Sequence, residues 1–418
     1  MPSPDTPADA WQTAQDIRAG RVTSVEVVTR SLARIHELQP ALNAFTVVLD
    51  DSALASARDA DEAVRRGGPL PALHGVPVSV KDHIWMADAP ATNGSLILRD
   101  FVPPADAVPV ARLRAAGAVI VGKTNNPEFC YRGFTDNLLF GLTRNPWDLQ
   151  RTPGGSSGGA GSSVAAGMTA IALGTDGGGS IRIPASFCGV VGHKPTFGLV
   201  PKEPGFRGWK TLSVDGPLAR SVCDAALMLS VIAGPAAADD MSYPGPPPGT
   251  YLDAVAHPRD MHGLRVAWSE DLGMLPVDPD VRAVFAEAVQ VLAELGCELA
   301  EAAAADRASH RVVEHDRPGR GLFVGGPASV IVARADVTGD RRDRRSRARH
   351  HRWPIRRCTA RQSSLHPSVG GVLRAARPPG DPGHATDRLP GRAADAGADP
   401  GTVRRSVLRR LVHHLPPG

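Results

Sequence analysis

The chain has 418 residues, 42% of them hydrophobic, and a net charge of +4. This length allows one large domain or two smaller ones with a sizeable buried core. The sequence contains no run of eighteen apolar residues, so we predict no transmembrane helix. It has no basic N-terminal segment followed by an apolar one, so we predict no secretory signal. The five cysteines are odd in number and widely spread, without a Cys/His cluster. We therefore expect a cytoplasmic, reduced protein without a metal site or a disulfide framework.

The charge is divided unevenly along the chain. Residues 1–302 contain 24 basic and 33 acidic residues, a local charge of −9, whereas 303–418 contain 23 Arg, no Lys and 10 acidic residues, a local charge of +13. The basic balance of the whole chain thus comes from its C-terminal part. We do not interpret it as a nucleic-acid footprint of the core, and we expect no nucleic-acid or membrane partner.

The first predicted elements are helices. Thr23 and Glu26 have the spacing of a capping box, which predicts a helix beginning there. A second helical stretch near 52–66 ends at Gly67 and Gly68, as helices often do.

Strands and helices then alternate. Valines at every second position of 76–80 predict a strand that ends at Lys81. Asp106 is placed to cap a helix through Ala116, and a buried strand is predicted at 118–121. The same order returns with a strand at 264–268 and a helix at 279–295, the latter with Asp278 at its N-cap and Gly296 after its end. This alternation predicts an α/β fold with a mixed or parallel sheet covered by helices.

Residues 303–418 have a different character. They are rich in Arg, Pro, Gly, Ala and His, and no apolar periodicity holds for more than a few residues. We hypothesise either a disordered basic tail or a segment translated in the wrong reading frame. The predicted division is thus a catalytic core over 1–302 and an atypical segment over 303–418. If this segment is translated in the wrong frame, we expect an incomplete fold and a weakly active chain.

Two glycine-rich stretches carry the candidate chemistry, GGSSGG at 154–159 and GGGSIRIP at 177–184. Neither matches the phosphate-binding patterns GxxxxGK[ST] or GxGxxG after a strand, so nucleotide binding is disfavoured. An oxyanion hole is the alternative, because consecutive backbone N–H groups can converge on a developing alkoxide. A plain glycine-rich turn explains the pattern equally well. The candidate donors are the N–H groups of Gly177, Gly178, Gly179 and Ser180.

A serine nucleophile in such a loop needs a base. A Ser-His-Asp arrangement has support from GGSSG at 154–158, but no buried strand precedes it, and His83 and His193 lack a distinctive context. A neutral lysine is the other candidate, because burial lowers the pKa of an ammonium group. Lys81 and Lys123 both end apolar runs, and composition alone does not choose between them.

Five motifs together resemble the amidase signature family, in the order and at the spacing of that family, over about residues 10–300. They are GVPVSVKD at 75–82, GKTN at 122–125, GGSSGG at 154–159, GTDGGGSIRIP at 174–184 and FCGVVGHKPT at 187–196. The resemblance implies a Ser–cis-Ser–Lys triad, with Ser180 as nucleophile, Ser156 as bridging serine and Lys81 as base. It further implies that Ser157 orients this relay and that Asp176 and Arg182 brace the loop.

The resemblance implies hydrolysis of a carboxylic amide through an acyl-enzyme, with a small-molecule amide as substrate. It implies no cofactor, and it is compatible with a homodimer. Within the family, GKTNNPEF at 122–129 looks more like the free-standing amidases than like the A subunit of the tRNA-dependent amidotransferase. The amidotransferase component stays an alternative. So does an inactive family member disrupted after residue 302, and a nucleic-acid-binding protein acting through its Arg-rich tail ranks third.

Overall fold

The computed structural model describes residues 9–302, except 207, 209–210, 248 and 273–275, together with 322–324 and 330–332. Its central feature is a six-stranded sheet in the order β1-β3-β2-β4-β6-β5. The middle strands β3, β2 and β4 run parallel, and β1, β6 and β5 each pair antiparallel with a neighbour. The strands are β1 Phe45–Val48, β2 Pro77–Lys81, β3 Val119–Thr124, β4 Ile171–Asp176, β5 Val191–Gly192 and β6 Val214–Ala219.

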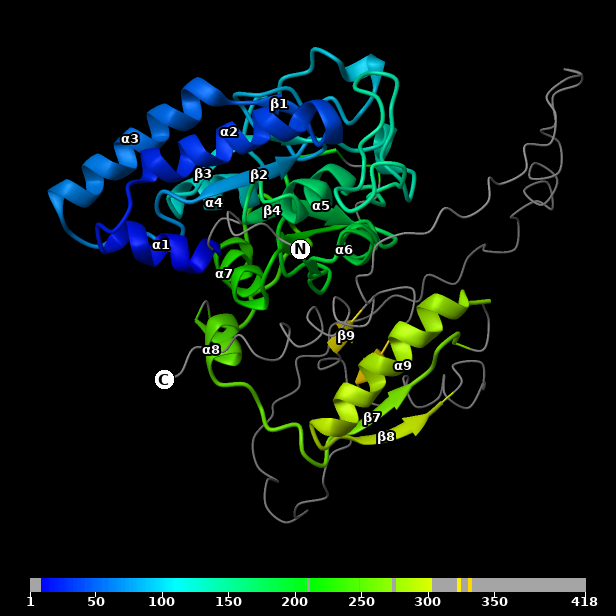
Figure 1. Ribbon diagram of the computed structural model, residues 1–418. Helices are drawn as coiled ribbons and strands as arrows, with labels where there is room; N and C mark the ends of the chain where they lie inside the picture. The colour runs from blue at the N-terminus through cyan, green and yellow to red at the C-terminus, as the bar shows by residue number, and fades with distance from the viewer. Residues whose placement is uncertain are drawn as a thin grey trace, which may run out of the picture. The chain divides into compact units, whose positions relative to one another are not determined.

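Helices cover both faces of this sheet (Figure 1). Because successive side chains of a strand point to opposite faces, Val78 and Val80 join one core cluster with residues of α4 and α7, whereas Val119 and Val121 join another with residues of α2 and α3. A third cluster packs α5 against β4 and β6. The helices are α1 Ala10–Arg18, α2 Ser24–Leu42, α3 Asp50–Arg66, α4 Val108–Ala115, α5 Gly158–Ala165, α6 Arg182–Cys188, α7 Val222–Ile232, α8 Thr250–Ala256 and α9 Pro279–Glu294, with short 3-10 turns at η1 Leu96–Leu98 and η2 Glu128–Cys130. The predicted mixed sheet covered by helices is thereby confirmed.

The predicted helix starts and ends are confirmed at α2 and α3. The Thr23 hydroxyl accepts from the N–H of Glu26 at 3.1 Å, and the Glu26 carboxylate accepts from the N–H of Thr23 at 2.8 Å, so the capping box is complete. Helix α3 ends at Gly67, whose φ of 75° lies in the region that favours glycine.

The predicted cap by Asp106 is wrong. Helix α4 begins at Val108, after Ala107, and no side chain caps it. The Asp106 carboxylate instead accepts from the N–H of Ala87 at 2.9 Å and pairs with Arg114 at 3.0 Å. A charged guanidinium is a stronger partner than a helical N–H, and this explains the different use of the carboxylate.

A second sheet of four strands has the order β8-β7-β10-β9. Its strands are β7 Arg265–Trp268, β8 Glu298–Glu301, β9 Leu322–Val324 and β10 Val330–Val332. Helix α9 connects the parallel pair β7 and β8 and has Asp278 as its N-cap, as predicted; the carboxylate accepts from the N–H of Asp280 at 2.9 Å. Strands β9 and β10 come from the atypical segment after residue 302, whose other residues lie outside the described part. Within the described residues, no helix is long and apolar enough to cross a membrane.

Candidate active site

Lys81 lies at the carboxyl end of β2, in the middle of the parallel strands, and is fully buried. Its Nζ makes hydrogen bonds with three hydroxyls: Ser156 Oγ at 2.7 Å, Thr175 Oγ1 at 2.8 Å and Ser157 Oγ at 3.0 Å. Burial lowers the pKa of Lys81 below its ordinary value, although the neighbouring Cys130 opposes this shift. A lysine with a lowered pKa can hold the uncharged form that a general base needs.

The loop that carries Ser156 is pressed against the chain at 134–135. A Cβ at Gly155 would lie 2.7 Å from the backbone N of Phe134, so only glycine fits there. Thr135 Oγ1 donates to the carbonyl of Gly154 at 2.9 Å and accepts from the N–H of Gly158 at 3.1 Å. The peptide bond between Gly155 and Ser156 is cis, as the family resemblance implied.

Ser180 follows β4 in the second glycine-rich loop, which Asp176 organises. The Asp176 carboxylate accepts from the N–H groups of Gly179 at 2.7 Å and Ile181 at 3.2 Å, and it pairs with Arg182 at 2.9 Å. Burial works against ionisation of Asp176, but Arg182 and these N–H groups outweigh it and lower the pKa of the carboxyl. Asp176 and Arg182 therefore brace this loop.

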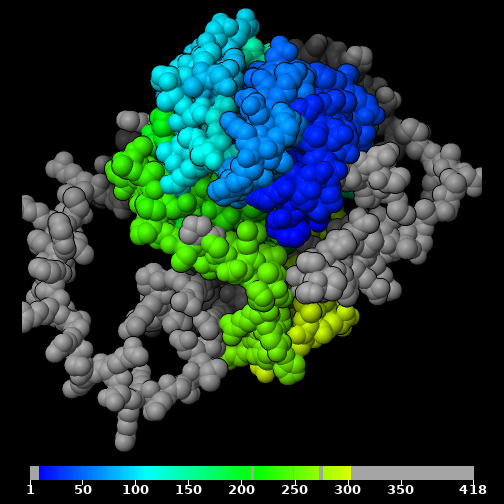
Figure 2. Space-filling view, turned by 90° about the vertical axis from the view of Figure 1, so that its left-hand side faces the viewer, coloured from blue at the N-terminus to red at the C-terminus, as the bar shows by residue number. Residues whose placement is uncertain are grey.

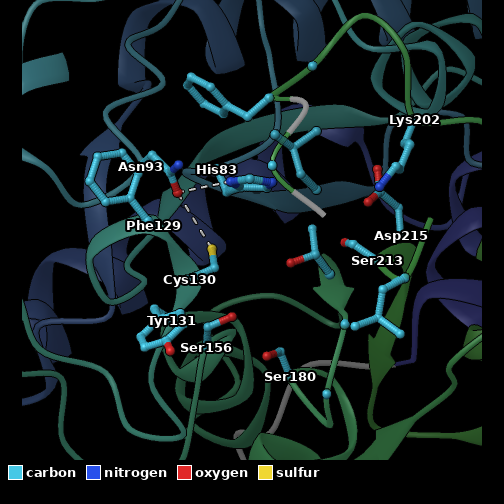
Figure 3. A pocket seen from close by; sticks show the side chains of 18 of the residues that line it. His83, Asn93, Phe129, Cys130, Tyr131, Ser156, Ser180, Lys202, Ser213 and Asp215 are labelled. Atoms are coloured by element: carbon cyan, nitrogen blue, oxygen red, sulfur yellow. Dashed lines mark hydrogen bonds between the residues drawn. The ribbon is translucent and has the colours of Figure 1, made fainter. Parts of the chain in front are cut away.

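The two loops meet through their backbones. The N–H of Ser157 donates to the carbonyl of Ser180 at 3.1 Å. Figure 3 shows the side chains of Ser156 and Ser180 on the same side of one pocket.

The oxyanion donors need one correction. The N–H of Gly179 is directed to Asp176, and so are those of Ile181 and Arg182 at the start of α6. The first N–H groups of α6 are therefore occupied by the Asp176 carboxylate and are not available to an incoming anion. The candidate oxyanion donors reduce to Gly177, Gly178 and Ser180.

The other candidate bases lie elsewhere or have other partners. Lys123 is buried, but its Nζ donates to the backbone carbonyls of Ile84 at 2.7 Å and Pro90 at 3.4 Å, and burial lowers its pKa to about 8. His193 contributes its backbone to the pairing with β6. His83 lies in the pocket, where its Nδ1 is 2.9 Å from Asn93 Oδ1.

The pocket in front of Ser156 and Ser180 has a volume of about 470 Å³. One wall is aromatic, with Trp85 and Phe206 edge to face at 5.7 Å between ring centres. Lys202 and Asp215 lie across the pocket from Asn93 and Phe129 (Figure 3). Burial raises the pKa of Asp215 to about 6, against the effect of nearby cationic groups.

Sequence reasoning missed three residues of this site. Thr175 supplies the third hydroxyl to Lys81, and its place beside Asp176 in the second glycine motif was the available signal. Cys130 reaches the pocket from the end of η2 and Asn93 from a turn, and no pattern in the sequence marks them. Among the described residues, no group of three or more His, Cys, Asp or Glu side chains is arranged to hold a metal.

The model of the Amidase family matches residues 26–311. The chain belongs to the amidase signature family. Its curated relatives include the A subunits of glutamyl-tRNA(Gln) amidotransferase from two bacteria. That of Cyanothece sp. strain PCC 7425 is 44% identical over 66% of this chain and 57% of its own length, and that of Acidothermus cellulolyticus is 45% identical over 68% and 56%. This amidase-signature chain thus spans less than two thirds of the length of the relatives it matches.

Solved structures of amidase-signature enzymes share the fold. A bacterial aryl acylamidase is 30% identical with a TM-score of 0.67, covering 75% of this chain and 64% of its own. The peptide amidase of Stenotrophomonas maltophilia is 35% identical with a TM-score of 0.66, covering 72% and 62%. The A subunit of the Thermotoga maritima glutamyl-tRNA(Gln) amidotransferase is 32% identical with a TM-score of 0.57, covering 67% and 58%. These comparisons show that the chain shares the fold of amidase-signature enzymes.

Proposed function

We propose that the chain hydrolyses a carboxylic amide through an acyl-enzyme on Ser180. The observation that carries this proposal is the contact of 2.7 Å between Lys81 Nζ and Ser156 Oγ at a fully buried lysine. In the proposed relay, uncharged Lys81 takes the proton of Ser156, and Ser156 takes that of Ser180. Ser180 then attacks the amide carbonyl.

The remaining groups have supporting roles in this proposal. The N–H groups of Gly177, Gly178 and Ser180 would stabilise the oxyanion. Ser157 holds Lys81 in place and also accepts from the N–H of Thr175 at 3.2 Å, so it connects the relay to β4. The proton returns through Ser156 to the leaving amine, and water hydrolyses the acyl-enzyme.

The test is hydrolysis of a chromogenic aryl anilide. We expect Ser180→Ala and Ser156→Ala to lower kcat by at least ~10³-fold, as for other nucleophile–base units. Ser163→Ala is the matched control, because Ser163 is also buried but its hydroxyl donates only to the carbonyl of Ala160 at 3.0 Å. Full activity in Ser180→Ala would overturn the proposal.

A second candidate is glutamine amide hydrolysis as the A subunit of an amidotransferase. Two observations favour it: the curated relatives at 43–45% identity include several such proteins, and each of these matches covers 66–68% of this chain. The structural neighbours that are hydrolases favour a free-standing amidase instead.

Ammonia release from glutamine separates these two candidates. A free-standing amidase is expected to prefer the anilide, whereas an amidotransferase component is expected to release ammonia from glutamine and to be inert toward the anilide. The same Ser180→Ala variant serves as the blank for both substrates.

A further inference from the structure

Cys130 belongs to a cluster in the pocket that the relay does not use. Its Sγ lies 3.6 Å from Asn93 Oδ1, and the same oxygen is 2.9 Å from Nδ1 of His83 (Figure 3). All three residues line the pocket that contains Ser156 and Ser180. A half-buried thiol beside an imidazole, open to a cavity, is a reactive arrangement.

The backbone holds this cluster in an uncommon conformation. Among the described residues, five that are not glycine have positive φ, and three of them are here: Asn93 at 51°, Phe129 at 51° and Cys130 at 57°. The N–H of Phe129 donates to the carbonyl of Asn93 at 2.8 Å, which ties the two segments together. Left-handed residues other than glycine concentrate at functional sites, and two in succession direct the thiol into the pocket.

The charges around the thiol favour its ionised form. Burial alone would raise the pKa of Cys130, but Lys81, His83 and a hydrogen bond with Ser156 outweigh it and lower the pKa to about 6. Burial lowers the pKa of His83, and Cys130 reverses this, so the net shift is upward. Cys130 and His83 therefore each favour the charged form of the other. The other ionisable groups lining the pocket are Tyr131, Arg132, Lys202 and Asp215.

We propose that Cys130 is a modification site, a thiolate that small uncharged carbon electrophiles alkylate inside the amidase pocket. The sulfur forms a bond to carbon and the halide of a reagent such as iodoacetamide leaves; no proton is released, because the thiolate is the reactant. The adduct then occupies the space in front of Ser156 and prevents amide binding. The blocking step rests on the proposed function, whereas the alkylation does not.

The remaining described cysteines provide internal controls. Burial raises the pKa of Cys188 to about 12 and that of Cys223 to about 11, and it also raises that of Cys297. At pH 7 the thiols of Cys188 and Cys223 hold on the order of 10⁻⁴ or less as thiolate, and the higher nucleophilicity of a basic thiolate recovers only about half of that deficit on a logarithmic scale. Cys130 should therefore react about 30- to 100-fold faster.

The experiment is iodoacetamide labelling of the whole chain at pH 5 to 8, followed by peptide mass mapping. We expect Cys130 to be alkylated at least ~30-fold faster than Cys188 and Cys223 at pH 7, with a rate that rises through a midpoint near 6. Equal or slower labelling of Cys130 overturns the proposal. This readout needs no turnover, so it holds even if the chain hydrolyses no amide.

The blocking step has its own readout. Loss of anilide hydrolysis should follow alkylation of Cys130 at the same rate, and whatever activity Cys130→Ser retains should resist iodoacetamide. Cys223→Ser is the matched control and should be inactivated like the unmodified chain. Full hydrolysis by protein that is alkylated at Cys130 overturns the blocking step.

Discussion

Lys81 is the residue on which the proposed chemistry depends, because a relay needs an amine that can lose its proton. Lys81→Arg keeps a cation and its hydrogen-bond donors but removes the ability to deprotonate at any accessible pH. We expect kcat to fall by at least ~10³-fold per folded molecule. Lys123→Arg is the matched control: it introduces the same bulk at another buried lysine that contacts only backbone carbonyls, so turnover of the folded fraction should persist.

The pH dependence follows from the direction of the Lys81 shift. Burial lowers the pKa of Lys81 below 10.5, so the uncharged base gains population as the pH rises through that lowered value. We expect kcat/KM for the anilide to increase with pH and to level off below pH 10.5. A profile that falls over the alkaline range would contradict an uncharged lysine as the base. Control measurements of unfolding at each pH separate this effect from loss of the fold.

The choice between Lys81 and Lys123 shows what sequence can provide at the scale of a residue. Both follow apolar runs, both are buried, and burial lowers the pKa of each. Only the register of three separate segments distinguishes them, because Ser156, Ser157 and Thr175 must meet one amine. Apolar periodicity does not predict that these hydroxyls contact one amine. The assignment of Lys81 came instead from the family motifs.

At the scale of the element, each helix and strand predicted from local signals is present, although together they are a minority of the observed elements. The capping box at Thr23 and the valine alternation before Lys81 each correspond to an observed boundary. The prediction that Asp106 caps α4 was wrong because Arg114 binds the same carboxylate. Cys130 and Asn93 could not be predicted, since their positive φ values depend on contacts between distant loops.

The glycine loop offers an element-scale prediction. Gly155→Ala would place a Cβ 2.7 Å from the backbone N of Phe134, and backbone cannot move aside as a flexible side chain can. We expect a loss of about 1–3 kcal/mol in the free energy of unfolding, typical of overpacking, together with reduced kcat as Ser156 shifts. Gly133→Ala is the matched control, because its Cβ would meet only Ile183 at 4.0 Å. Urea unfolding and anilide turnover measure both effects.

At the scale of the whole molecule, Asp224 ties the start of the described chain to its later part. Its carboxylate, fully buried in α7, accepts from the N–H groups of Ala10 and Trp11 at the beginning of α1, each at 2.9 Å. Figure 2 shows the blue N-terminal residues directly against green ones. This contact spans 214 positions, so helix propensity and capping patterns could not have predicted it.

Burial, and secondarily the charge of Asp9, raises the pKa of Asp224 from 3.8 to about 6. Between these values the folded chain holds a proton that the unfolded chain has released. The corresponding stability is therefore fully present below about pH 3.8 and is lost as the pH rises through about 6, a change of up to about 3 kcal/mol. Asp224→Asn cannot titrate, so its free energy of unfolding should fall less between pH 4 and 6.5. Urea unfolding between pH 4 and 6.5 measures this change. The control Asp59→Asn, at an exposed position, should show the same dependence of the free energy of unfolding on pH as the unmodified chain. If Asp224→Asn also kept that dependence, Asp224 would be ionised throughout this range.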